Sequence, residues 1–147
     1  MPATSPITSF IGKHSFLSNF YPARVEFDRQ TFPSVEHAYQ AAKTLVPIER
    51  RIFHTGISAG QAKRAGRRVT LRADWIDVKL PIMLDLLRKK FWDDDLAQQL
   101  LATQDAELVE GNHWGDTFWG VCRGEGANHL GRLLMQVRQE IGAPETT

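Results

Sequence analysis

Apolar residues recur at helical spacing in two long segments of the chain, and this periodicity constrains the fold to one built mainly from helices. One segment begins after Asn128, which we expect to act as its N-cap, and the other follows Asp74. Pro81 interrupts the second segment, so we expect a kink or a fresh helix start there. The apolar faces consist of Leu130, Leu133, Leu134, Val137 and Ile141 in the first segment and of Leu80, Met83, Leu84, Leu87 and Phe91 in the second.

Shorter helices and extended segments fill the rest of the chain. Ser34 is a good N-cap and begins the first clear helix, and three further helices are predicted over 47–53, 58–66 and 94–103. Runs of β-branched and aromatic residues predict extended structure over 7–11, a hairpin over 25–32 with its turn at 28–30, and strands over 108–111 and 118–122. Helices and strands do not alternate as βαβ units would. The predicted fold is therefore α+β, mostly helical with a small β-sheet.

Length and composition fit one globular domain with no global charge. The 147 residues, 42% of them hydrophobic, suffice for a single core, which we expect over about residues 10–141, between short flexible tails MPATSP and GAPETT. A net charge of +1 gives no field that would hold nucleic acid non-specifically. Cys122 is the only cysteine and is expected to be a buried structural thiol in a reducing compartment. We recognise no signal peptide and no apolar run of membrane-spanning length, so we expect a cytoplasmic protein.

The stretch SVEHAYQAAK, residues 34–43, mixes ionisable residues with small apolar ones. At about 100° per residue, Glu36, Tyr39, Gln40 and Lys43 fall on one side of the predicted helix, backed by alanines that allow another element to approach closely. This stripe is either a solvated face with ordinary side-chain pairing or one wall of a catalytic site, and periodicity leaves both interpretations open. His37 lies off the stripe, where packing is the more common role of a lone histidine.

A second informative stretch is NHWGDTFWG, residues 112–120. Tryptophan offers a stiff, flat surface that suits a stacked base, and a nearby carboxylate such as Asp116 can bind ribose hydroxyls or stabilise a developing cation. The alternative is a buried aromatic cluster in which Asp116 caps a turn. The glycines of GEGANHLG, residues 124–131, match neither G-x-G-x-x-G nor a Walker A motif, so a turn into the last helix is favoured.

A basic cluster follows in AKRAGRRV, where Lys63, Arg64, Arg67 and Arg68 occur within six residues. Such a cluster is commonly a solvated face, and it gains a function only if it holds a phosphate through charge-assisted hydrogen bonds. The histidines show no metal-ligand spacing, and H-E-x-x-H and G-x-S-x-G motifs are absent from the sequence. We therefore expect neither a metal nor a cofactor.

Several phrases, in a fixed order, resemble the NADAR family, also called YbiA-like N-glycosidases. The similarity spans roughly residues 10–141, and its most specific parts are S-x-E-H-x-Y-Q-A-x-K and D-x-F-W-G followed by G-x-N-x-L-G-x-L-L-M-x-x-R. The matching phrases are FLSNFYPA at 16–23, FPSVEHAYQAAK at 32–43, AKRAG at 62–66, DW at 74–75, KKFWDD at 89–94 and WGDTFWGVCRGEGANHLGRLLMQVR at 114–138.

This resemblance implies an α+β fold and an enzyme that hydrolyses the bond between ribose C1 and a nitrogen base. It makes Glu36 the catalytic carboxylate, Lys43 a second catalytic candidate and Asp116 a third. A carboxylate suits this chemistry because breaking the bond generates positive charge at C1, and a lysine with a lowered pKa can attack C1 as an amine. The residues expected to bind substrate are Asn19, Phe20, Tyr39, Gln40, Lys63, Arg64, Trp114, Trp119 and Asn128.

The substrate class stays open between a small metabolite and a nucleic-acid adduct. Family substrates are phosphoribosylamino-pyrimidine intermediates of riboflavin synthesis and, in other members, ADP-ribose attached to guanine in nucleic acid. The near-neutral charge favours the small metabolite, because no long basic stripe exists to grip a duplex. A module that binds ADP-ribose without catalysis is the alternative from another class. The sequence leaves the oligomeric state open.

Overall fold

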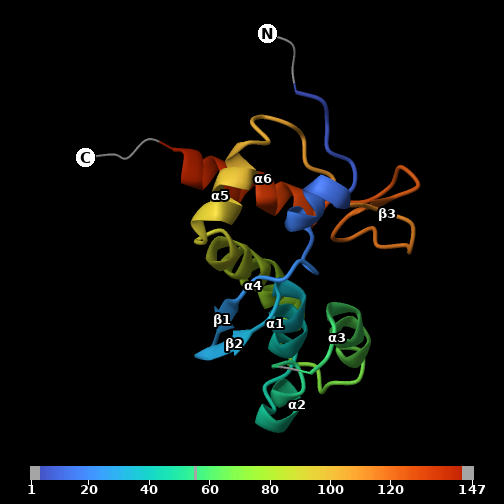
Figure 1. Cartoon of the computed structure of the whole chain (residues 1–147). Coiled ribbons are helices and arrows are strands. Elements are labelled where there is room, and N and C mark those ends of the chain that lie inside the picture. Colours follow the sequence, from blue (N-terminus) through green and yellow to red (C-terminus); the bar gives the residue numbers. More distant parts are fainter. Residues whose placement is uncertain (1–3, 55, 144–147) are drawn as a thin grey trace. The chain divides into compact units, whose positions relative to one another are not determined.

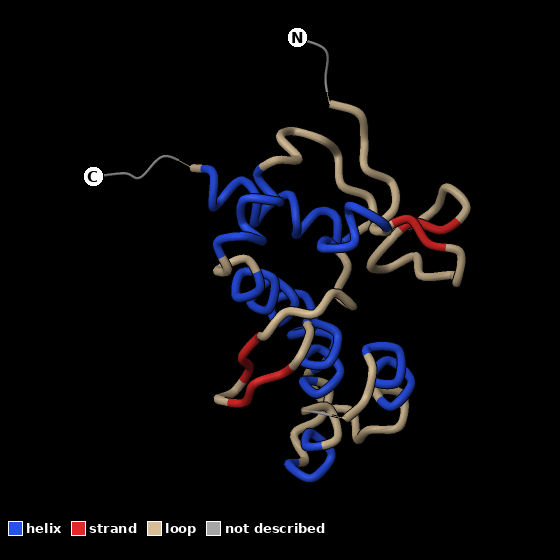
Figure 2. Tube along the Cα trace, in the orientation of Figure 1, coloured by secondary structure: helices blue, strands red, loops and turns tan. Residues whose placement is uncertain are grey.

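The computed structural model describes residues 4–54 and 56–143, and residues 1–3 and 144–147 of the two predicted tails lie outside that part. The described chain is mostly helical with two very short sheets, as predicted for an α+β fold (Figure 2). Contacts divide it into two units, which we call the α1 unit, residues 19–90, and the α6 unit, residues 4–18 and 91–143. The expectation of a single domain stays a prediction.

The α1 unit contains a hairpin and four helices (Figure 1). Strands β1 (Val25–Phe27) and β2 (Gln30–Phe32) pair antiparallel. Asp28 and Arg29 form the turn between them, both with positive φ, as a two-residue hairpin turn requires. The helices are α1 (Val35–Ala42), α2 (Pro47–Arg51), α3 (Ala59–Ala65) and α4 (Trp75–Lys90).

Helix α1 is the central element of this unit. It packs against α2, α3, α4 and both strands of the hairpin, and all eight of its residues are buried (Figure 1). Ser34 caps its N-terminus as predicted, because its hydroxyl accepts a hydrogen bond from the His37 N–H at 3.1 Å. The start of α3 is also fixed locally, by a capping box between Ser58 and Gln61.

Helix α4 runs through Pro81 as one element, so the alternative of a fresh helix start at this residue is wrong. Proline removes one backbone N–H and thereby leaves the carbonyl of Asp77 without its helical donor. Both residues are exposed, so water can satisfy that carbonyl. The buried face includes Met83 and Leu87, as the sequence predicts.

The α6 unit contains a 3₁₀ helix, η1 (Gly12–Leu17), two α-helices and two strands of two residues each. The α-helices are α5 (Asp94–Leu101) and α6 (His129–Gly142), which pack against each other. Strands β3 (Gly111–Asn112) and β4 (Val121–Cys122) pair in parallel. Of the predicted extended segment 7–11, Ile7 forms a bridge with Leu108. Cys122 is buried, as expected of a structural thiol.

The predicted strand over 118–122 is wrong at its first residues. The N–H groups of Phe118 and Trp119 donate to the carboxylate of Asp116, and their carbonyls accept from the first N–H groups of α6. These backbone groups are therefore used by a turn and a helix start, and strand pairing is left to Val121 and Cys122.

Asn128 occupies the N-cap position of α6 but makes no capping hydrogen bond with its side chain. Its backbone is left-handed, with φ 54°, and the side chain turns to the preceding segment. There it donates to the Leu108 carbonyl at 2.9 Å and accepts from the Glu110 N–H at 3.0 Å. Gly131 allows this approach, since a Cβ there would overlap the Leu108 carbonyl oxygen. The prediction of Asn128 as the N-cap residue is therefore confirmed in position, but its side chain does not cap the helix.

Lys90 is 1% exposed, and its ammonium lies 5.8 Å from the centroid of the Tyr21 ring. Burial lowers the pKa of Lys90 from 10.5 to about 7, because a low-dielectric environment disfavours the charged form. Between about pH 7 and pH 10.5, Lys90 binds more protons in the unfolded chain than in the folded chain. The free energy of unfolding therefore rises with pH over this range.

We expect Lys90→Met to be more stable than the wild type at pH 7, with the difference narrowing toward pH 10 as the wild-type lysine loses its charge in both states. Urea unfolding of both proteins across this range measures the difference. Lys13→Met, at an exposed position, is the control. A wild-type-to-variant difference that stays constant with pH would contradict the role of the buried charge.

Candidate functional site

The predicted stripe on α1 is buried rather than solvated. Glu36 is 7% exposed, Tyr39 7% and Gln40 4%, while Lys43 at the C-cap is half-buried. A solvated face is therefore excluded for this helix. The candidate side chains of Glu36, Tyr39 and Gln40 are instead buried by the packing of their own helix, with Lys43 half-buried at its end.

Glu36 is fixed through both its backbone and its side chain. Its N–H donates to the carbonyl of Asn19 at 3.0 Å, which ties the start of α1 to the segment before the hairpin. Its Oε1 accepts a hydrogen bond from Gln40 Nε2 at 2.8 Å. A carboxylate held by a donor and removed from water is suited to proton transfer or to stabilising a cation.

Lys43 ends α1 and is held by its backbone. Its carbonyl accepts from the Arg72 N–H at 2.7 Å, and the Arg72 guanidinium forms an ion pair with Asp74 at 2.6 Å. The side chain leaves this anchor and places its ammonium 5.6 Å from the centroid of the Tyr39 ring. The position of the lysine is thus set independently of what its amine binds.

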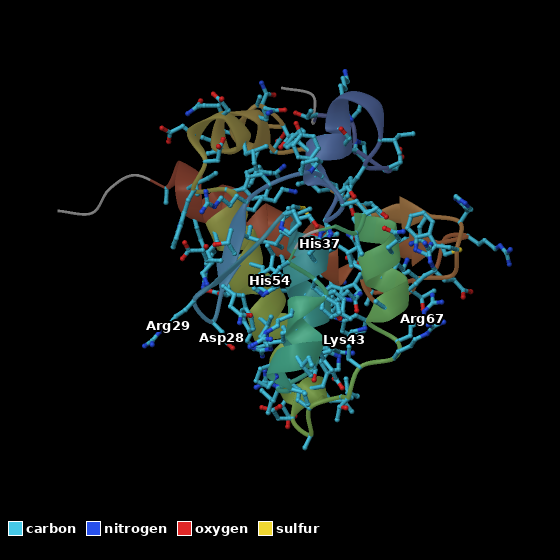
Figure 3. The ribbon with its side chains drawn as sticks, turned by 60° about the horizontal axis from the view of Figure 1, so that its bottom comes forward. Asp28, Arg29, His37, Lys43, His54 and Arg67 are labelled. Atoms are coloured by element: carbon cyan, nitrogen blue, oxygen red, sulfur yellow. The ribbon has the colours of Figure 1, made fainter. Side chains whose placement is uncertain are left out.

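The pKa of Lys43 is lowered from its ordinary value, chiefly because burial disfavours the ammonium form. Glu36 acts in the opposite direction and raises the pKa, while the positive charges of Arg67, Lys79 and Lys63 lower it further. Lys43 lies at the end of α1 and Arg67 just after α3 (Figure 3). The arrangement increases the neutral amine fraction near neutral pH, which is the form that attacks carbon.

The cations around Lys43 differ in part from those predicted. Lys63 is one of the charges that lower the pKa of Lys43, whereas Arg64 is exposed beside Gly60 of its own helix. Arg67 and Lys79 were missed. Arg67 belongs to the same basic run as Lys63, so the sequence contained a signal for it. Lys79 is an isolated lysine on α4, and no sequence pattern marks it.

Asn19 and Phe20 differ in their relation to this group. Asn19 is buried and contacts Glu36 through its backbone, and its amide donates weakly to Met83 Sδ at 3.7 Å. Phe20 is 44% exposed and presents an aromatic surface to solvent. The structure therefore brings the Asn19 backbone to the backbone of Glu36, the candidate catalytic residue.

His37 has a structural role, as the sequence favours. It is 4% exposed, its Nδ1 lies 2.6 Å from the Ser34 hydroxyl, and its Nε2 lies 2.9 Å from the Ile57 carbonyl. These contacts engage both ring nitrogens and link the start of α1 to the segment before α3. Both ring nitrogens of His37 are therefore used in contacts that stabilise the fold.

The remaining predicted residues belong to the α6 unit. Asp116 Oδ1 accepts from the N–H groups of Phe118 at 3.1 Å and Trp119 at 2.9 Å, so this carboxylate caps a turn. Asn112 holds the same residue from the other side, accepting from its N–H at 3.0 Å and donating to its carbonyl at 2.9 Å. The turn-capping interpretation of Asp116 is confirmed, and its side chain is rigidly placed.

The aromatic residues of this loop differ in exposure. Trp119 is half-buried and packs edge-on against Phe118, with ring centroids 4.8 Å apart, and Phe118 packs on His129 at 4.5 Å. Trp114 is 55% exposed and contacts His113. The loop is thus partly a packed cluster and partly an exposed aromatic surface.

Within residues 4–54 and 56–143, no three His, Cys, Asp or Glu side chains gather closely enough to hold a metal ion. In the same part of the chain, no helix has the length and apolar composition needed to cross a membrane.

Similarity to known proteins extends over nearly the whole chain. A riboflavin biosynthesis protein of Vibrio vulnificus is 42% identical over 133 residues, which are 87% of this chain and 36% of the relative. The chain thus spans about a third of that protein. An N-glycosidase of Nostoc punctiforme is 40% identical over 131 residues, covering 84% of this chain and 83% of the relative.

The fold is also similar to a solved structure. The NMR structure of the Escherichia coli protein YbiA matches with a TM-score of 0.82 and 34% identity, covering 96% of this chain and 87% of the other. The model of the NADAR domain matches residues 9–142, which include every predicted site residue and both units. The chain therefore belongs to the NADAR domain family.

Proposed function

We propose that this chain is an N-glycosidase that hydrolyses the bond between ribose C1 and the nitrogen of a phosphoribosylated amino-pyrimidine, with Glu36 and Lys43 as its catalytic residues. The observation that carries the proposal is their pairing on α1: a buried carboxylate and a lysine whose pKa is lowered by burial, seven positions apart on one helix face. Relatives named as N-glycosidases and riboflavin biosynthesis proteins support the bond and the substrate class.

The reaction follows from the two groups. The neutral Nζ of Lys43 forms a bond to C1, the electrons of the C1–N bond pass to the base nitrogen, and the carboxyl of Glu36 gives that nitrogen a proton. The nitrogen lone pair of the adduct then opens the sugar ring, the ring oxygen takes the proton lost by Nζ, and a Schiff base results. Water adds to C1, assisted by the Glu36 carboxylate, and releases the sugar and the lysine.

The cations near Lys43 fit the phosphate of such a substrate. Lys63, Arg67 and Lys79 all act electrostatically on Lys43, and charge-assisted hydrogen bonds from lysine and arginine are the usual means of binding phosphate. The same cations would accept the diphosphate of ADP-ribose on guanine, which makes an ADP-ribosyl glycohydrolase the second candidate. Trp119 and Trp114 as stacking surfaces and Asp116 as a further catalytic carboxylate stay predictions.

Glu36→Gln should lower kcat by about 10²–10⁴-fold, because the variant keeps the shape and loses the proton-transfer group. Wild type and variant are each offered a phosphoribosylamino-pyrimidine and an ADP-ribosylated guanine oligonucleotide, and base release is measured. Preferential cleavage of the first substrate supports the proposal, and preferential cleavage of the second supports the alternative. If the wild type cleaves neither substrate, the proposal that the chain is an N-glycosidase is rejected.

Borohydride should trap a sugar on the wild-type enzyme during turnover, since reduction of the Schiff base makes the bond to Lys43 permanent. Mass spectrometry of the digested protein locates the adduct. Lys43→Ala should give no adduct and little turnover, and incubation with borohydride alone is the control. Full activity of Lys43→Ala would rule out covalent catalysis.

Asp116 can be tested with two variants that separate its charge from its turn. Asp116→Asn keeps an oxygen that accepts from Phe118 and Trp119, so its stability should stay close to that of the wild type, and kcat should fall only through the lost charge. Asp116→Ala also loses both hydrogen bonds and should be destabilised by about 1–2 kcal/mol. Wild-type turnover by Asp116→Asn would restrict this residue to the turn.

A further inference from the structure

Gly66 ends α3 in an ordinary helical conformation, with φ −61° and ψ −18°. An alanine can adopt this backbone without strain, so conformational freedom does not explain the glycine. Space does. A Cβ at residue 66 would overlap Gln40 Oε1 and would lie 2.6 Å from Gln40 Cδ. The side-chain amide of Gln40 occupies the place that any other residue at 66 would fill.

Gln40 is 4% exposed and stands one helical turn after Glu36 on α1. Its Nε2 donates to Glu36 Oε1 at 2.8 Å, and its own Oε1 is buried against Gly66 without a hydrogen-bond donor among the described residues. Rotating the amide by half a turn would bring Oε1 against the carboxylate oxygen of Glu36. The carboxylate therefore fixes which end of the amide faces Glu36, and Gly66 leaves room for the other end.

We propose that Gln40 is a positioning residue that holds the Glu36 carboxylate in its reactive orientation, and that Gly66 is required because only glycine leaves the room for it. The chain of contacts runs from the C-cap of α3 through one amide to the carboxylate. This role rests on the proposed function of Glu36, and it differs from the substrate contact expected of Gln40 from the sequence.

Loss of this contact should affect the placement of the Glu36 carboxylate rather than the affinity for substrate. A hydrogen bond to a carboxylate is stronger than one between neutral groups, and it restricts the rotation of the Glu36 side chain. A misplacement of a catalytic group by about 1 Å can cost on the order of 100-fold in rate. Loss of the positioning contact should therefore reduce kcat and leave KM nearly unchanged.

Two glycines of the same segment provide a matched pair of variants. Gly66→Ala forces the Gln40 amide to move, whereas a Cβ at Gly60 would meet only Arg64 Nη1 and Ser58 Oγ, each at 3.9 Å, which is ordinary contact. Gly60→Ala should therefore behave as the wild type. Gln40→Ala removes the donor directly. The double variant Gly66→Ala/Gln40→Ala removes the amide and its overlap with the new Cβ, and leaves an approach of 3.2 Å between the Cβ atoms of residues 40 and 66.

We expect Gly66→Ala and Gln40→Ala each to lower kcat by about 10- to 100-fold with KM changed less than about 3-fold. The double variant should match Gln40→Ala alone, because the added methyl has no amide left to displace. If Gly66→Ala does not fold, recovery of folding in the double variant supports the same contact. Equal kcat for Gly66→Ala and Gly60→Ala, or additive losses in the double variant, would overturn the proposal.

A readout without substrate separates this inference from the proposed function. The side-chain amide signals of Gln40, assigned by their absence in Gln40→Ala, are followed by ¹H–¹⁵N NMR. They should shift in Gly66→Ala and in Glu36→Gln and stay in place in Gly60→Ala. Such shifts without glycosidase activity in the wild type would reject the function and keep the contact. Unshifted signals in an active enzyme would reject the contact alone.

Discussion

The burial of α1 on every side is the constraint on which the α1 unit depends. A helix with all eight residues buried must find partners within the fold for most of its polar groups, and Gln40 Oε1 is left without a donor among the described residues. The Glu36 carboxylate accepts a hydrogen bond from Gln40, and the His37 ring nitrogens contact the Ser34 hydroxyl and the Ile57 carbonyl. The pairings that stabilise the unit are therefore the same pairings that orient the candidate catalytic carboxylate.

Burial also sets the balance of charges at Lys43. Removal from water lowers its pKa more than Glu36 raises it, and Arg67, Lys79 and Lys63 act in the same direction as burial. An anionic substrate held by these cations would cancel part of their effect and favour the ammonium. In the proposed reaction, departure of the phosphosugar would restore the field that favours the free amine.

Sequence reasoning predicted the helices and caps well where the signals were local. Ser34, the hairpin turn at 28–30 and the start of α3 each depend on a few neighbouring residues. The burial of the polar stripe was not predictable from its polarity, since a single helix does not reveal which elements surround it. Lys79 was missed because its approach to Lys43 is produced by tertiary packing.

The start of the predicted strand over 118–122 is a second case in which tertiary contacts override a local signal. Phe118 and Trp119 have strong strand propensity, yet one carboxylate and the first turn of α6 use their backbone groups. The family phrases located Asp116, and the turn-capping alternative described its contacts. Local composition predicted the turn-capping contacts of Asp116 here better than it predicted the secondary structure of the residues that follow.

The anchoring of Lys43 through its carbonyl has an evolutionary consequence. Arg72 holds the end of α1 by the backbone, so the helix terminus does not depend on which side chain stands at position 43. Under the proposed mechanism, exchange of the amine would remove the nucleophile and spare this backbone contact. On that proposal, a catalytic member of the family would be a single codon away from a protein that keeps the fold and no longer consumes its ligand.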